Sequence, residues 1–170
     1  MAADILPHNS ENNFQTDVLD IPSICITSLW RQPFNVIFRV GVQQTRFYCH
    51  KEVLRANSTK FAKELRETHE TLIIEVPDIS KEAFQTVVRY IYNSDLAVKY
   101  SYVVETMIVA NRYEFKSMKK ALLDFAKHRT DYTSAITLFK QFQSVSDDDE
   151  PGLIPLKELA LQTIDKYGLQ

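Results

Sequence analysis

The sequence predicts a protein of the α+β class, in which a small three-stranded sheet is surrounded by helices and followed by a C-terminal helical pair. Apolar side chains alternate with polar ones in three short stretches, which is typical of half-buried strands. Elsewhere they recur at spacings of three and four, which is typical of amphipathic helices. With 170 residues and 45% apolar content, the chain is long enough for one domain, or one domain with a short appendage.

The N-terminal region divides into two parts. Residues 1–18 are polar, and we expect a mobile leader there. Asp20 then stands at an N-cap position and Pro22 suits an early helical position, so a short amphipathic helix is predicted over residues 21–31. Its apolar side chains are Ile21, Ile24, Cys25, Leu29 and Trp30.

Three strands are predicted. FNVIFRVG (34–41) and TRFYCH (45–50) form a pair joined by GVQQ, and LIIEV (72–76) is the third strand, with Leu72, Ile74 and Val76 on one face. Successive side chains of a strand point to opposite faces. Cys49 is therefore expected on the apolar side with Phe47, and His50 on the other side with Tyr48.

Helices occupy most of the remaining chain. Helical spacing begins after His50, NST (57–59) is a break and a new cap, and Phe61 and Leu65 follow at i and i+4. Ser80 is predicted to cap a helix that ends at YNSD, and Ser101 to cap another that breaks near Glu114 before a further helix. The apolar positions of these three helices are Phe84, Val87, Val88, Ile91 and Tyr92, then Val104, Met107 and Ile108, then Met118, Ala121, Leu122 and Phe125.

Two more helices are predicted beyond Asp131. The first carries Ile136, Phe139 and Phe142, and the second ends at Gly168. The acidic stretch SVSDDDEPG separates them. The second helix carries Leu156, Leu159, Ala160 and Ile164. We expect the two apolar stripes to pack on each other rather than to leave an open ligand site.

Composition argues against several classes of function. The 20 basic and 22 acidic residues nearly cancel, so no overall field favours nucleic acid or an anionic membrane, and no stretch is long enough to span a bilayer. Three glycines are too few for a phosphate-binding loop, and no cofactor is predicted. The N-terminus has no signal-peptide pattern and there are two cysteines without CxxC spacing. We therefore expect an intracellular protein, cytoplasmic or nuclear.

Cys49 and His50 form the one adjacent pair of residues that could suggest catalysis or metal binding. They are predicted on opposite faces, and no further ligands are spaced for a closed tetrahedral site. His69 and Glu70 begin like HExxH, but residue 73 is Ile. Neither a catalytic nor a metal site is predicted, and we expect the protein not to be an enzyme.

Several phrases, in this order, resemble the BTB/POZ family: FNVIFRVG, FYCHKEVLRANSTKF, EVPDISKEAFQTVVRYIYNSDL and VVETMIVANRYEFKSMKKALLDFA. The resemblance covers residues 19–130, and residues 131–170 resemble the paired helices that begin a BACK or 3-box extension. It implies a module for protein–protein interaction, and the leading hypothesis is a substrate adaptor of a cullin-3 ubiquitin ligase. The alternative is a dimerising scaffold of a transcriptional regulator or other assembly, without cullin binding.

The resemblance implies a contact surface for the cullin-3 N-terminal domain. Leu65-Arg66-Glu67 matches the family's phrase of a hydrophobic residue, any residue and Glu, although the loop before the third strand is shorter here; Glu67 could equally be a solvated charge at a helix end. Tyr113 resembles a cullin-contacting position of MATH-type adaptors, or is an aromatic residue covering the core. The helices beyond 131, with Phe139, would extend the same groove.

The resemblance also implies a homodimer interface on the helix 21–31, through Ile21, Ile24, Cys25, Leu29 and Trp30. The alternative is that this helix covers its own domain. Family dimers often carry Asp where this chain has Asn35, so the charge partner expected for Lys51 is missing.

Overall fold

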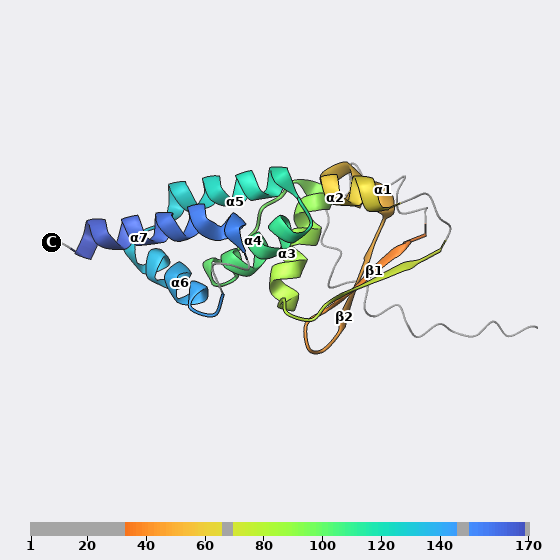
Figure 1. Ribbon diagram of the computed structural model, residues 1–170, viewed down its shortest axis with the longest axis horizontal. Helices are drawn as coiled ribbons and strands as arrows, with labels where there is room; N and C mark the ends of the chain where they lie inside the picture. Colours follow the sequence, from red (N-terminus) through yellow and green to blue (C-terminus); the bar gives the residue numbers. More distant parts are fainter. Residues whose placement is uncertain (1–32, 66–69, 146–149, 169–170) are drawn as a thin grey trace, which may run out of the picture.

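The computed structural model describes residues 33–65, 70–145 and 150–168 of the chain. In these ranges the elements gather into one sheet with helices packed against it and a helical layer beyond them (Figure 1). The predicted leader and the predicted helix 21–31, including Ile21, Ile24, Cys25, Leu29 and Trp30, lie outside the described residues.

The sheet has three strands, as predicted, in the order β2-β1-β3. The central strand β1 (Val36–Val40) runs antiparallel to β2 (Thr45–Cys49) and parallel to β3 (Leu72–Val76). The β1–β2 turn uses Gly41 at φ 70°, in the left-handed region that glycine tolerates best. The two edges of the sheet are therefore β2 and β3.

The two faces of the sheet differ in character. The inner face is buried and faces the helices; it carries Val36, Phe38, Val40, Phe47, Cys49 and Val76. On the outer face, Ile37 is in register with Tyr48 of β2 and with Ile73 of β3, and we call these three residues the outer row. Leu72 was predicted on the apolar face with Ile74 and Val76, but it is 38% exposed because it lies at the start of an edge strand.

Two short helices follow β2. They are α1 (Lys51–Asn57) and α2 (Thr59–Glu64), separated at Ser58 as the NST phrase predicted. After β3, the turn leads into α3 (Lys81–Asn93), whose N-cap is Ser80 with its hydroxyl accepting from the Ala83 N–H, also as predicted. Phe84 of α3 packs on the inner face, with its ring 4.9 Å from that of Phe38 and 5.0 Å from that of Phe47.

Helices α4 (Val103–Arg112) and α5 (Lys116–Arg129) come next. The break between them falls at Glu114, which has a positive φ of 54°. The prediction that Ser101 caps α4 is wrong. Ser101 lies inside a 3₁₀ turn, η3 (Tyr100–Tyr102), and the N-cap position belongs to Tyr102, without a side-chain capping bond.

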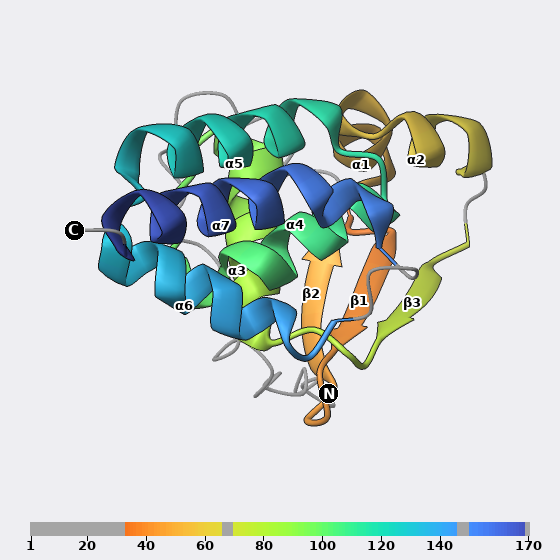
Figure 2. The same ribbon diagram turned by 60° about the vertical axis from the view of Figure 1, so that its left-hand side comes forward.

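The predicted C-terminal pair consists of α6 (Tyr132–Phe142) and α7 (Ile154–Gly168), with the 3₁₀ turn η4 (Pro151–Leu153) before α7. The two helices lie side by side (Figure 2). The predicted face of α6 is displaced: Ile136 and Phe139 are only half-buried. Phe142 of α6 and Leu156 and Ala160 of α7 are buried as predicted, and Ala135 and Leu138 of α6 are buried in addition.

The core continues from the sheet into this pair, because Leu138, Leu156 and Ala160 belong to the same buried cluster as Phe38 and Phe84. Among the described residues, no helix combines the length and the apolar character that crossing a bilayer requires.

Candidate protein-interaction site

Ser58 connects the break between α1 and α2 to the turn between α4 and α5. Its hydroxyl oxygen accepts from the Phe61 N–H at 2.9 Å, which caps α2. The same hydroxyl donates to the Tyr113 carbonyl at 2.5 Å. Ser58 is buried. One side chain therefore satisfies a helix N-terminus and a loop carbonyl that would otherwise lack a buried partner.

Tyr113 lies in the aromatic core beneath this junction. Its ring stacks on Phe61 with 5.1 Å between centroids and meets Phe38 edge-on at 6.0 Å, and the residue is 7% exposed. Lys60 Nζ lies 5.7 Å from the ring centroid. Burial raises the pKa of the Tyr113 hydroxyl, and Arg112 partly offsets that rise. The structure therefore gives Tyr113 the core-covering position that was one of its two predicted roles.

Leu65 ends α2 on the other side of Phe61. It is buried, and its N–H donates to the Phe61 carbonyl at 2.9 Å. Leu65 and Tyr113, two predicted cullin-contact residues from distant parts of the sequence, therefore both interact with Phe61, Leu65 through its backbone N–H and Tyr113 through its ring. Glu67, the third, lies outside the described residues.

Exposed charged side chains surround this buried junction. Lys63 and Glu64 lie on the last turn of α2, Glu114 lies in the α4–α5 turn, and Lys116 begins α5. Thr59 donates a hydrogen bond to Glu114, and this bond is the main reason that the pKa of the exposed Glu114 carboxyl is lowered. The surface over the junction is therefore charged, and its apolar side chains lie beneath it.

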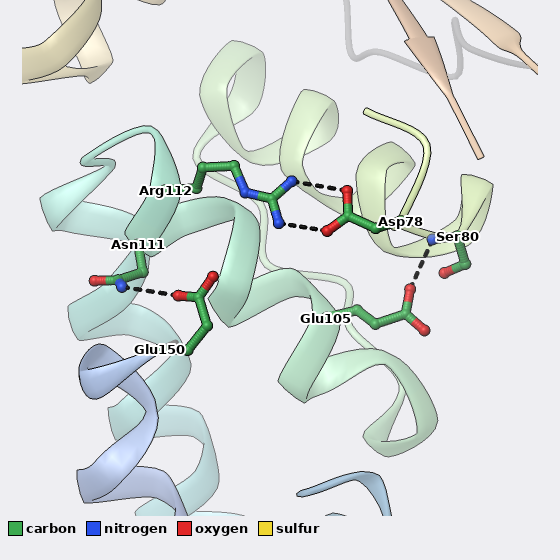
Figure 3. A network of polar contacts seen from close by, with 6 residues as sticks. All are labelled: Asp78, Ser80, Glu105, Asn111, Arg112 and Glu150. Carbon is green, nitrogen blue, oxygen red and sulfur yellow. Dashed lines mark hydrogen bonds and ion pairs between the residues drawn. The ribbon is translucent and has the colours of Figure 1, made fainter. Parts of the chain in front are cut away.

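Arg112, next to Tyr113, ties α4 to the turn that follows β3 (Figure 3). Its guanidinium forms a bidentate contact with the Asp78 carboxylate, with Nη1 donating to Oδ1 at 2.9 Å and Nη2 donating to Oδ2 at 2.5 Å. This contact is the largest cause of the lowered pKa of Asp78. Nearby, the Ser80 N–H donates to Glu105 at 2.7 Å, so that α4 holds both ends of the turn before α3.

Asn111 connects α4 to the helical pair. Its side-chain amide nitrogen donates to Glu150, just before η4, at 3.2 Å (Figure 3). Its side-chain oxygen accepts from Lys119 of α5 at 2.7 Å. Gly152 packs so closely that a Cβ there would lie 2.3 Å from the Asn111 side-chain oxygen. Nothing in the sequence indicated this contact or the Arg112–Asp78 pair, because each joins residues far apart in the chain.

Comparison with known proteins identifies a family with which this chain can be compared. The sequence profile of the BTB/POZ domain matches residues 28–130. The chain belongs to the BTB/POZ family. One solved structure similar to it is the BTB domain of zebrafish PATZ1, at 26% identity and a TM-score of 0.47, with 56% of this chain and 76% of that chain covered. No curated protein matches the chain significantly.

BTB domains are modules for protein–protein interaction, and this chain is one of them. The matched region ends at residue 130, just after α5, so α6 and α7 follow the BTB domain as an additional helical pair. Phe139, the fourth predicted cullin-contact residue, lies half-buried on α6.

Cys49 and His50 do not converge on a shared site in this BTB domain. Cys49 is on the inner face, and burial raises the pKa of its thiol to about 12, which opposes thiolate formation. The prediction that His50 lies on the wetter face with Tyr48 is wrong, because His50 is 1% exposed at the start of α1. Its Nδ1 lies 2.8 Å from the Tyr92 hydroxyl, and its ring packs 4.7 Å from that of Phe34.

Lys51 is also buried, at the point where the family phrase predicted a missing charge partner. The Asn35 side-chain oxygen accepts from the Lys51 backbone N–H at 2.7 Å, and Lys51 Nζ donates to the Glu70 carbonyl at 2.9 Å. Asn35 therefore fixes the strand–helix junction through the backbone, and the ammonium has a neutral oxygen as a hydrogen-bond acceptor.

Proposed function

We propose that this BTB domain, with its helical pair, is the scaffold-binding part of a substrate adaptor for a cullin-3 ubiquitin ligase. The observation that carries the proposal is that Leu65 and Tyr113, far apart in the sequence, both interact with Phe61 of α2 and belong to one buried cluster. A partner that approaches this junction would meet the end of α2 and the α4–α5 turn as one surface.

The contact would be made by the exposed rim, with the buried residues beneath holding it in shape. Leu65 and Tyr113 are too buried to supply much contact area of their own. Lys63, Glu64 and Glu114 are exposed on adjacent segments, and a helix from a scaffold protein could lie across them. The adaptor itself would contribute proximity, holding a target near an enzyme that transfers ubiquitin.

The helical pair supports an adaptor because it adds surface that is rigidly joined to the BTB domain. Leu138 and Leu156 share its core, and Asn111 bonds to the segment before η4. In our proposal the pair is the start of a BACK or 3-box extension, and Phe139, half-buried on α6, is its candidate contact residue.

Titration calorimetry with a purified cullin-3 N-terminal domain tests this function. We expect binding with a dissociation constant tighter than about 10 μM, which corresponds to roughly 7 kcal/mol. Charge reversal by Glu64→Lys and by Glu67→Lys should weaken binding, because both change the end of α2 or the sequence directly after it. Asp165→Lys is the matched control, since Asp165 is exposed near the end of α7, far from α2 (Figure 1). Lack of binding at tens of micromolar would refute the adaptor role.

A second candidate function is a dimerising scaffold without a cullin. It is favoured by the exposed apolar side chains on the outer face of the sheet, Tyr48 and Ile73, which a second copy could cover. Light scattering on the wild-type chain and on Leu29→Asp tests it. A dimer that Leu29→Asp dissociates would support the scaffold, and a monomer at high concentration in both would count against it.

A further inference from the structure

The outer face of the sheet presents an apolar band that no described helix covers. Tyr48 is 39% exposed and Ile73 is 47% exposed, with Ile37 between them in register. The next row on the same face is polar: Arg39 lies between Arg46 and Glu75, and Arg39 Nη1 is 3.0 Å from Glu75 Oε1. An apolar row beside a charged row has the pattern of a docking surface for an amphipathic element.

The chain enters the sheet at the end where this apolar row lies. Asn35 is fixed on both sides: its N–H donates to the Cys49 carbonyl at 3.2 Å, and its carbonyl accepts from the Leu72 N–H at 3.0 Å. Phe34 is half-buried, and its ring centroid lies 5.9 Å from that of Tyr48. Residues 34 and 35 therefore lie at the end of the sheet where the outer row is.

The preceding segment has the length and composition that this face needs. A helix over residues 21–31 would be about 16 Å long at 1.5 Å per residue. The three strands span about 10 Å, because neighbouring strands lie about 4.8 Å apart. The segment reads IPSICITSLWR, so Arg31 is its one charged residue, and its apolar stripe would be costly to leave in water.

We propose that residues 21–31 dock on the outer row of their own sheet, covering Tyr48, Ile37 and Ile73. Only Gln32 and Pro33 separate the segment from Phe34, so the Cα atoms of Arg31 and Phe34 are at most about 11 Å apart, which limits how far the segment can lie from this face. The same short link makes docking within one chain independent of protein concentration. The inference is separate from cullin binding. Docking of residues 21–31 on their own sheet would occupy the apolar side chains that a dimer interface needs. The inference therefore disfavours the dimerising scaffold.

Trp30 is the one tryptophan of the chain, so its fluorescence reports the position of this segment directly. We expect Trp30 in the wild-type chain to have blue-shifted emission and slow quenching by acrylamide. Ile73→Asp should shift the emission to the red and speed quenching. Ile73→Thr, which keeps a β-branched side chain suited to a strand, should do so to a smaller extent with the far-UV spectrum unchanged. Val42→Asp is the matched control, since Val42 is 95% exposed in the β1–β2 turn.

Two further measurements complete the test. The effect of Leu29→Asp on unfolding should be smaller in the Ile73→Thr background than in wild type, because contacting residues are not additive. The wild-type emission should not change on dilution. Water-exposed emission in the wild type, or blue emission that both Ile73 variants leave unchanged, would overturn the proposal. A red shift on dilution would also overturn it, because the segment would then be docked on a second copy.

Discussion

Ser58 shows how one short side chain can fix the relation between distant segments. Its hydroxyl both accepts from the Phe61 N–H and donates to the Tyr113 carbonyl, and the residue is buried. The NST phrase predicted the capping role, because Ser at a break between two helical patterns is an N-cap signal. The bond to Tyr113 was not predictable, since its partner lies 55 residues away.

Replacing Ser58 by alanine should therefore cost more than the loss of an ordinary cap. Removal of an N-cap costs about 1 kcal/mol, and a buried carbonyl left unsatisfied costs at least about 1 kcal/mol more. We expect Ser58→Ala to lower the free energy of unfolding by about 2 kcal/mol in urea denaturation. Ser101→Ala, at an exposed position of η3, should change it by less than about 0.5 kcal/mol. Equal effects of the two substitutions would contradict this account.

Asp78 gives a prediction about pH. The hydrogen bonds from Arg112 lower its pKa in the folded protein, so its contribution to stability is present above its ordinary pKa of about 4 and is lost as the pH falls through the folded value. The Asp78 side chain is 52% exposed, so Asp78→Asn should cost less than about 1 kcal/mol at pH 7. The cost should be smaller near about pH 2 than at pH 7, because the Asp78 carboxyl is then more often protonated and neutral, as the amide of Asp78→Asn always is. A cost that stays constant in urea titrations at the two pH values would disprove the role of charge.

At the scale of elements, the sequence predicted those features that depend on neighbouring residues, such as helix caps and the positions of the strands. Ser80 caps α3, and the three strands appear where the alternation placed them. Ser101 does not cap α4, because the chain enters that helix through η3. On α6, Phe142 has helical spacing both with Ile136 and Phe139 and with Ala135 and Leu138, so the pattern offers two faces. Packing against the neighbouring helices, which the pattern does not contain, selects the second.

Gly152 governs the contact between the helical pair and α4. A Cβ at this position would displace the Asn111 amide, which is held by Glu150 and Lys119. We expect Gly152→Ala to lower the free energy of unfolding by about 1 to 2 kcal/mol, because two partly buried hydrogen bonds are disturbed. In an Asn111→Ala background the same change should be nearly neutral, because the clash has gone. A double-mutant cycle by urea denaturation measures this difference, and additive effects would rule the contact out as the cause.

At the scale of the whole molecule, the buried cluster runs without interruption from Phe38 in the sheet to Leu156 in α7. Proteins with one continuous core usually unfold in a single transition. We therefore expect the far-UV signal of the helices and the near-UV signal of the tyrosines to give the same midpoint in urea. Two separate midpoints would show that the BTB domain and the helical pair unfold as independent units.

The parallel pairing of β1 with β3 has a consequence for synthesis on the ribosome. β1 and β2 are neighbours in sequence, but β3 can join only after α1 and α2 have been made. Phe84, which packs on Phe38 and Phe47, emerges later still. A nascent chain that ends before this point carries a two-stranded hairpin with an uncovered aromatic face, the kind of intermediate that chaperones bind. A pause in translation between β2 and α3 would therefore be the most hazardous one for this protein.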